Sequence, residues 1–162
     1  MGCDIHIRTE VKRYRSNDKE RQNGVWICAD KFVVNHDHIL YGEEERYSVE
    51  NEIYEDRNYR LFAVLAGVRN NYDVTPISPP RGLPVDASDE TKQYHNSYGS
   101  DAHSESFLTL EELEQYQHWE HPIHGDLFKG TIDKLRNLTR QHSYPEYEIR
   151  ADDVRIVFWF DN

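Results

Sequence analysis

Two Asp-x-His pairs are the residues of this sequence best suited to chemistry. Asp4 and His6 lie in MGCDIHIRTE, and Asp101 and His103 lie in SYGSDAHSES. In an extended strand, residues two apart point to the same side, so each Asp can meet its His. A divalent cation such as zinc or manganese takes carboxylate oxygen and imidazole nitrogen and generates hydroxide near neutral pH. Together, the four side chains predict a hydrolytic metal site with Asp4, His6, Asp101 and His103 as ligands.

The same residues allow two alternatives that need no metal. Asp4 can orient the ring of His6 and fix its tautomer, which makes His6 a general base. His103 is followed by Ser104 in a serine-rich loop, a place where reactive groups are common. The expected catalytic residues are therefore His6, His103 and Ser104. In the second alternative, both pairs only make local hydrogen bonds.

Two arginines supply the expected anion site. Arg57 opens the clearest helix of the chain, where backbone amides favour anions. Arg81 and Gly82 lie in the proline-bounded loop PPRGLP, where a glycine lets the backbone approach a ligand closely. A phosphate or carboxylate between Arg57 and Arg81 would be held by both, so the expected partner is a small anionic ligand. Alternatively, Arg57 pairs with Asp56 or Glu55, and Arg81 only solvates its loop.

Other motifs are weaker or absent. The segment HWEHPIH is interrupted by Pro122, and His36-Asp37-His38 lies in a stretch without a predicted element. The motifs GxxxxGK[ST], GxGxxG, CxxC and GxSxG do not occur, so nucleoside triphosphatases, dinucleotide enzymes, zinc ribbons and serine hydrolases of those classes lack their signatures.

Composition limits the class of protein. The 162 residues fit a single domain, 1–162. Thirty acidic against nineteen basic residues give a net charge of -11 without a basic run, which disfavours a nucleic acid duplex as partner. Two cysteines make no disulfide framework, and no apolar stretch is long enough to enter a membrane. We therefore expect a soluble protein of a reducing cytoplasm.

The order of the expected elements indicates an α+β fold. Residues 3–13 and 25–34 predict a hairpin that turns at Asn23-Gly24, and its exposed edge would permit a homo-oligomer. Residues 154–160, VRIVFWF, are apolar on both faces and predict a central strand. We expect a mixed or antiparallel sheet that contains both terminal strands, packed with three to four helices. The expected helices are residues 57–69 capped by Asp56, residues 88–94, a helix through LEELEQYQHW that starts from the capping box of Thr109 and Glu112, and a helix between residues 126 and 141. Residues 36–55, with the acidic run 43–45, receive no element.

Five blocks of the sequence resemble a family of uncharacterised bacteriophage and bacterial proteins. These blocks are MGCDIH, RNYRLFAVLAGVRN, PRGLP, DAHSESFLTLEEL and the closing VRIVFWFDN, in this order over nearly the whole chain. The resemblance implies a phage or prophage accessory protein that acts in the cytoplasm of a bacterial host cell. The blocks contain the polar residues Asp4, His6, Arg57, Asn58, Arg69, Arg81, Asp101, His103 and Ser104, which favours one common site.

Two functions follow as hypotheses. The first is a hydrolase or phosphodiesterase that acts on a small phosphorylated, nucleotide-like molecule, with the Asp and His side chains as metal ligands or as acid and base. In this hypothesis Arg57, Asn58, Arg81 and Gly82 bind the phosphorylated ligand. The second is a binding protein without chemistry, which sequesters a nucleotide signal or blocks a host protein.

Overall fold

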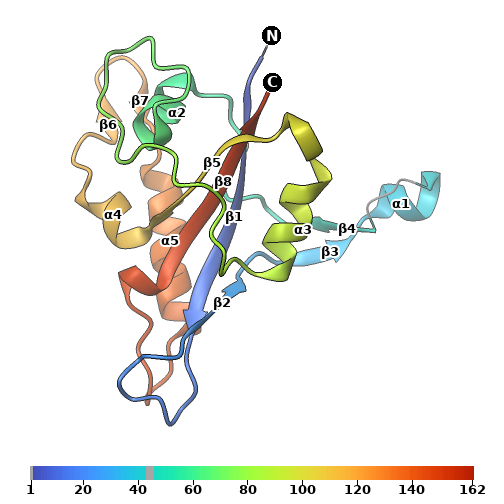
Figure 1. Cartoon of the computed structure of the whole chain (residues 1–162), viewed down its shortest axis with the longest axis vertical. Coiled ribbons are helices and arrows are strands. Elements are labelled where there is room, and N and C mark those ends of the chain that lie inside the picture. Colours follow the sequence, from blue (N-terminus) through green and yellow to red (C-terminus); the bar gives the residue numbers. More distant parts are fainter. Residues whose placement is uncertain (1, 43–45) are drawn as a thin grey trace.

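The computed structural model describes residues 2–42 and 46–162, so the acidic run 43–45 lies outside the described residues. The fold is α+β, as predicted, and its centre is a four-stranded sheet in the order β2-β1-β8-β5. All three strand pairs are antiparallel. The two terminal strands lie side by side in the middle, and both chain ends meet at one end of the sheet (Figure 1). The strands are β1 (Asp4–Arg13), β2 (Val25–Cys28), β5 (His103–Thr109) and β8 (Val154–Asp161).

The two faces of the sheet differ in chemistry because β1 alternates. Ile5, Ile7 and Val11 point into the hydrophobic core, where they meet Phe158 and Phe160 of β8. The other face is polar, yet much of it is also buried. β8 is buried at seven of its eight residues, which confirms the prediction of a central strand. Every polar side chain under that second face therefore needs a partner.

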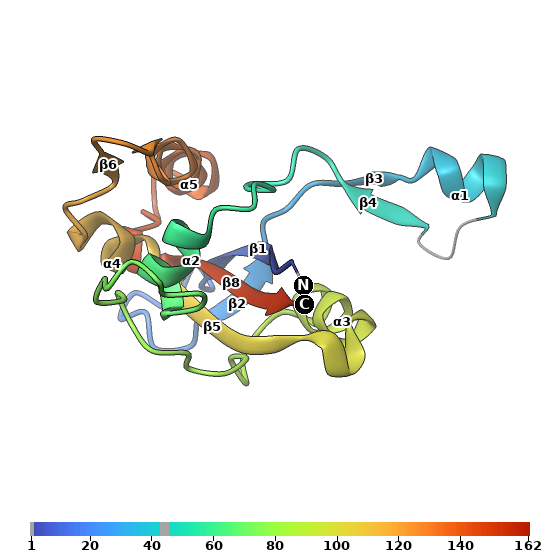
Figure 2. The same cartoon turned by 90° about the horizontal axis from the view of Figure 1, so that it is seen from above.

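Helices cover both faces. Figure 2 shows α5 (Lys129–His142) and α3 (Asp89–Ser97) on opposite sides of the sheet. α2 (Tyr59–Ala66) and α4 (Leu110–Gln115) add Phe62, Leu65 and Leu113 to the core on the side of α5. The expected capping box of Thr109 and Glu112 starts α4.

Two helix boundaries differ from the sequence prediction. α2 is capped by Asn58, whose side chain accepts from the amide of Leu61, and the expected Asp56 cap is wrong. Asn58 is a strong N-cap residue and ends the extended segment before the helix. Arg57 consequently lies outside the helix. α4 ends at Gln115, earlier than the expected helix through LEELEQYQHW.

An arm projects from the body of the molecule (Figures 1 and 2). It consists of β3 (Phe32–Val34), α1 (His36–Tyr41) and β4 (Tyr47–Val49), and β3 pairs with β4. The expected strand 25–34 is therefore divided: β2 pairs with β1, and β3 leaves for the arm. The remaining short elements are β6 (Glu120–His121), β7 (Gly125–Asp126) and the 3-10 turns η1 (Gly99–Asp101) and η2 (Ala151–Asp153). Among the described residues, no helix combines the length and apolar character that a membrane crossing requires.

Candidate functional site

The expected site residues gather at the end of the sheet where the chain termini meet. Asp4 is opposite Asp161, and the next row consists of Ile5, Phe160 and His103 on β1, β8 and β5. Asp101 lies in η1, directly before β5. The two Asp-x-His pairs are thus neighbours along the sheet, and this end of the sheet is our candidate site.

His6 and His103 nevertheless lie on opposite faces. Residues directly opposite each other in an antiparallel pair share a face. His103 is opposite Phe160, and the two rings stack with centroids 6.0 Å apart on the side of α2. His6 is opposite Trp159, whose ring packs against Tyr94 of α3 on the other side. The expected convergence of both pairs on one ion is therefore not present, because neighbouring positions of β8 alternate between its faces.

Asp4 has a different partner from the expected one. The guanidinium of Arg57 donates to both of its carboxylate oxygens, at 2.7 and 2.5 Å. This bidentate pair lowers the pKa of Asp4. Over residues 2–42 and 46–162, no three His, Cys, Asp or Glu side chains are grouped so as to hold a metal ion.

The two arginines expected to share an anion are far apart. Arg81 donates to both carboxylate oxygens of Glu112, at 3.1 and 2.5 Å, near the start of α4. Arg57 and Asp4 lie beside Asp161, whereas the α4 cap Thr109 is opposite Arg155. These positions are six residue steps apart on β8, which is about 20 Å in a strand. The structure therefore does not bring the two arginines together, and each one binds a carboxylate elsewhere.

The loop that contains Arg81 still borders the candidate site through its backbone. The amide of Gly82 donates to the carbonyl of Glu105 at 2.8 Å, and the amide of Arg81 donates to the hydroxyl of Ser106 at 3.2 Å. Gly82 has a positive φ of 83°, which a glycine adopts without strain. A Cβ at this position would meet nothing within 4 Å, so the backbone conformation rather than close packing favours glycine here.

Ser104 is one of five non-glycine residues with a positive φ among the described residues. Its φ is 54°, a left-handed conformation that costs a non-glycine residue about 1–2 kcal/mol. It lies in an irregularity of β5 between His103 and Ser106, where the pairing with β8 shifts register. The Ser104 hydroxyl oxygen is 3.0 Å from Nδ1 of His103. The Nε2 atom of His103 is buried and has no hydrogen-bond partner. Strained residues of this kind concentrate at functional sites.

His6 takes part in a chain of polar groups on the other face. Its Nδ1 is 3.0 Å from the hydroxyl of Tyr98, which is 2.8 Å from the hydroxyl of Tyr94. Its Nε2 is 3.3 Å from a carboxylate oxygen of Asp161. In the tautomer with hydrogen on Nε2, Nδ1 accepts from Tyr98 and the N–H lies beside Asp161, although the geometry to Asp161 is not that of a hydrogen bond.

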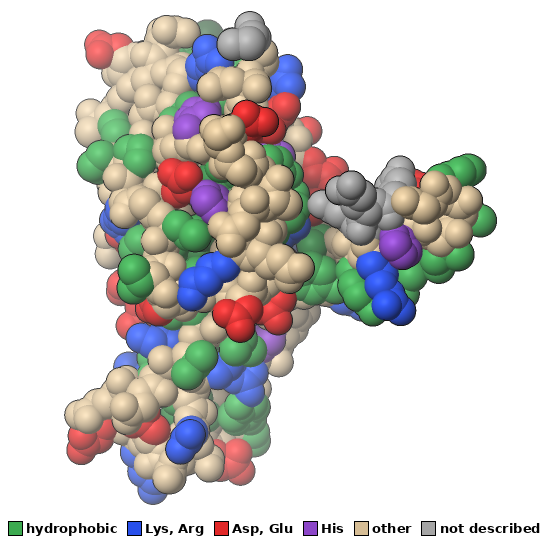
Figure 3. Space-filling model, turned by 45° about the vertical axis from the view of Figure 1, so that its right-hand side comes forward, with side chains coloured by type: hydrophobic (Ala, Val, Ile, Leu, Met, Phe, Trp, Pro, Cys, Tyr) green, Lys and Arg blue, Asp and Glu red, His purple; other side chains and the backbone are tan. Residues whose placement is uncertain are grey.

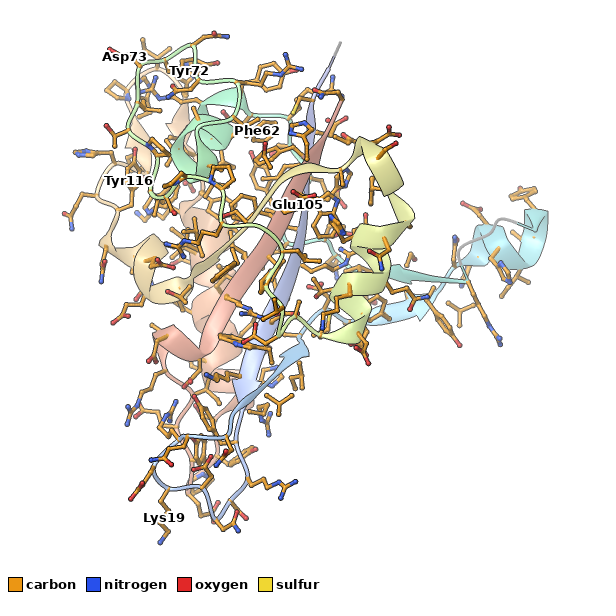
Figure 4. The ribbon with its side chains drawn as sticks, in the orientation of Figure 1. Lys19, Phe62, Tyr72, Asp73, Glu105 and Tyr116 are labelled. Atoms are coloured by element: carbon orange, nitrogen blue, oxygen red, sulfur yellow. The ribbon has the colours of Figure 1, made fainter. Side chains whose placement is uncertain are left out.

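Burial determines the protonation of this chain. It lowers the pKa of His6 despite the nearby Asp161 carboxylate, so the ring is neutral at pH 7. It raises the pKa of Tyr98, which keeps its proton and can donate it. The hydrogen bond between Tyr98 and Nδ1 of His6 ties the C-terminal end of α3 to β1, whereas Nε2 is buried beside Asp161 without a hydrogen bond. A second pair lies nearby, where Nε2 of His95 is 3.0 Å from Glu105, which Figure 4 shows on β5 beside α3.

Several of these partners were not expected from the sequence. Asp161, Tyr98 and His95 carry no motif, and Asp161 meets His6 only because the two ends of the chain pair. The one available signal was the alternation of β8, which places Asp161 on the face of Trp159.

A large cavity lies between the arm and α3. Its volume is about 720 Å³, within the range of small-molecule sites. Arg8 forms part of its wall, with its guanidinium 3.5 Å from the centre of the Tyr94 ring and 3.0 Å from Glu52. Burial raises the pKa of Glu52 although Arg8 opposes the shift. The cavity is lined by Arg8, Phe32, Arg46, Tyr47, Ser48, Val49, Glu52, Glu90, Gln93, Tyr94 and Ser97.

Comparisons of this chain with protein-family models, with curated proteins and with solved structures find no match.

Proposed function

We propose that this chain is a hydrolase that acts on a small phosphorylated, nucleotide-like molecule through Ser104 and His103. The observation that carries the proposal is the pair itself: a serine in a strained backbone conformation whose hydroxyl lies 3.0 Å from a histidine nitrogen. A hydroxyl nucleophile needs an adjacent base within hydrogen-bond reach. The proposal keeps the expectation of a phage accessory protein in a bacterial host.

The reaction needs only groups of this chain and water. His103 takes the proton of the Ser104 hydroxyl while the oxygen attacks phosphorus, and the leaving group departs with the proton from His103. Water then hydrolyses the phosphoserine, with His103 again as the base. The buried Nε2 of His103 has no hydrogen-bond partner in the structure, so in this scheme the substrate would have to supply one.

A cation for the substrate is available at the same end of the sheet. The guanidinium of Arg69 donates to the side chain of Asn162 at 2.8 Å. Asn162 follows Phe160, the partner of His103, by two residues, which is about 7 Å along a strand. Arg69 is therefore a better candidate for holding an anionic group than Arg57 or Arg81, because it donates to the uncharged amide of Asn162.

The experiment is incubation of the purified chain with linear and cyclic nucleotides, read by mass. We expect turnover that is lost in Ser104→Ala and reduced at least about 100-fold in His103→Gln. Ser100→Ala is the matched control, because Ser100 is exposed in η1 just before the site. A phosphoryl adduct on Ser104 after rapid denaturation would identify the nucleophile.

Two results would contradict the proposal. Turnover that survives in Ser104→Ala would exclude this serine as the nucleophile. Release of an intact nucleotide from the denatured protein, without turnover, would replace the hydrolase with the second hypothesis, a protein that sequesters its ligand. In that case the cavity between the arm and α3 is the place to test, by Arg8→Gln.

A further inference from the structure

The arm presents apolar side chains to solvent. α1 has no buried residue, and Ile39, Leu40 and Tyr41 are 66%, 68% and 77% exposed. Figure 3 shows hydrophobic side chains along the arm where it stands away from the body. A six-residue helix and a lone two-stranded hairpin are each marginal in water. The arm is therefore an element that a partner should cover.

The outer edge of β4 has backbone amides and carbonyls that could pair with another strand. The amide of Asn35 donates to the carbonyl of Arg46, and the amide of Glu50 donates to the carbonyl of Lys31. The backbone groups of Ser48, which lies midway between Arg46 and Glu50, therefore point toward β3. In an antiparallel ladder the alternate residues face away, which leaves the amides and carbonyls of Tyr47 and Val49 on the outer edge. β4 has neither proline nor charge within Tyr47–Val49, the usual protection of an exposed edge. All three of its residues also line the 720 Å³ cavity between the arm and α3.

We propose that the outer edge of β4 pairs with β4 of a second copy of this chain. A two-fold axis through Ser48 places Tyr47 of each copy opposite Val49 of the other copy. These are the two residues whose backbone groups face outward, so the pair would make four hydrogen bonds in a four-stranded sheet. The two arms would run antiparallel, and α1 of each would lie toward the body of the other.

Charge complementarity favours a second copy over another protein. In the register centred on Ser48, Arg46 is opposite Glu50 of the other copy, twice per dimer, and would join the ion pair that Glu50 already makes with Lys31 of its own hairpin. Opposite charges in direct cross-strand positions are favourable, as is an aromatic residue opposite a β-branched one. The outer edge of β3 lacks such a charge pair, because a two-fold axis through Val33 places Lys31 opposite the uncharged Asn35. Each copy carries a net charge of -11, a repulsion that physiological salt screens.

The test is the molar mass of the full chain in solution over a concentration series at physiological ionic strength. We expect two chains per particle for the unmodified protein. Arg46→Glu places two acids opposite each other, Glu50→Arg places two bases opposite each other, and each variant should be monomeric. A mixture of the two variants restores both opposite-charge pairs and should recover the dimer. Val85→Asp, at a loop residue that is 94% exposed, is the control and should stay dimeric.

The recovery in the mixture is the decisive result, because only this register predicts it. A monomeric unmodified chain at all concentrations would overturn the proposal and leave the arm to a different protein. A dimer that both charge variants retain, or a mixture that stays monomeric, would also overturn it. Circular dichroism of each variant establishes that a loss of dimer is not a loss of fold. The two proposals can fail independently. Nucleotide turnover measured in the monomeric variants tests the hydrolase, and their molar mass tests the dimer.

Discussion

Glu10 and Arg155 form an ion pair across the centre of the sheet, where their side chains are 0% and 4% exposed. Arg155 donates from Nε to one carboxylate oxygen of Glu10 at 2.8 Å. The other oxygen accepts from the amide of Ser88 and the hydroxyl of Thr91, both at 2.8 Å. One buried carboxylate thus joins two strands to the beginning of α3, the helix that contacts His6.

Glu10→Gln should lower the free energy of unfolding by about 3–5 kcal/mol, because it leaves the buried Arg155 charge with only the exposed carboxylate of Asp86 as its counter-charge. Urea denaturation measures this loss. Asp133→Asn is the matched control, since it breaks an exposed pair with Arg136 and should cost no more than about 1 kcal/mol. Equal losses in the two variants would show that Glu10 contributes little beyond a surface pair.

Local patterns in the sequence were sufficient for much of the fold. The continuous apolar run of β8 predicted its central place, and Thr109 with Glu112 predicted the start of α4. The strand 25–34 was predicted as one piece because apolar residues lie on both sides of Asp30 and Lys31. Its break depends on tertiary contacts, since Asp30 accepts from the hydroxyl of Thr9 on β1.

The sequence predicted which residues belong to the candidate site, but not how they are arranged on the sheet. The spacing within each pair placed an Asp beside its own His, and the shared sequence blocks favoured one common site, but neither could say which face of the sheet His103 takes. That face depends on the register of β5 against β8 and on the irregularity after His103. Likewise, the partner of Arg57 is Asp4, 53 residues away, rather than the adjacent Asp56 or Glu55.

Ser104→Gly should stabilise the fold by about 1 kcal/mol while it removes the proposed nucleophile. Glycine adopts a φ of 54° without the steric cost that serine has, although it also gains freedom in the unfolded chain. Thermal unfolding measures the gain, with Ser104→Ala as the comparison that removes the hydroxyl but keeps the strain. A Ser104→Gly variant less stable than Ser104→Ala would show that the backbone is not strained at this position.

The two thiols should be inert in the folded protein. Cys3 is fully buried, and burial raises its pKa. Burial and the nearby Asp30 carboxylate raise the pKa of Cys28 to about 12. Because the thiolate is the reactive form, Ellman's reagent at mild alkaline pH should titrate both groups only after unfolding. Rapid reaction of one thiol in the native protein, assigned with Cys28→Ser, would contradict this prediction.

The free energy of unfolding should fall in mild acid because of His6. Its native pKa lies below the value of about 6.5 that it has in an unfolded chain, because burial disfavours the charged ring. Between these two pKa values the unfolded state binds more protons, so stability falls as the pH drops through this window. Above about pH 6.5 the neutral ring contributes fully, and His6→Gln should be less stable than the unmodified chain. That difference in the free energy of unfolding should shrink as the pH is lowered toward 5, measured by urea denaturation at each pH.

Other histidines require a control in this experiment. Burial also lowers the pKa of His142 on α5, so part of the pH dependence should remain in His6→Gln and be removed in His142→Gln. The Tyr98→Phe variant keeps His6 but removes the hydroxyl that it accepts from. If the difference between His6→Gln and the unmodified chain instead grew in acid, the protonated ring would gain more from Asp161 than burial costs it. His6 would then hold α3 as a charged group, and the native pKa would lie above its usual value.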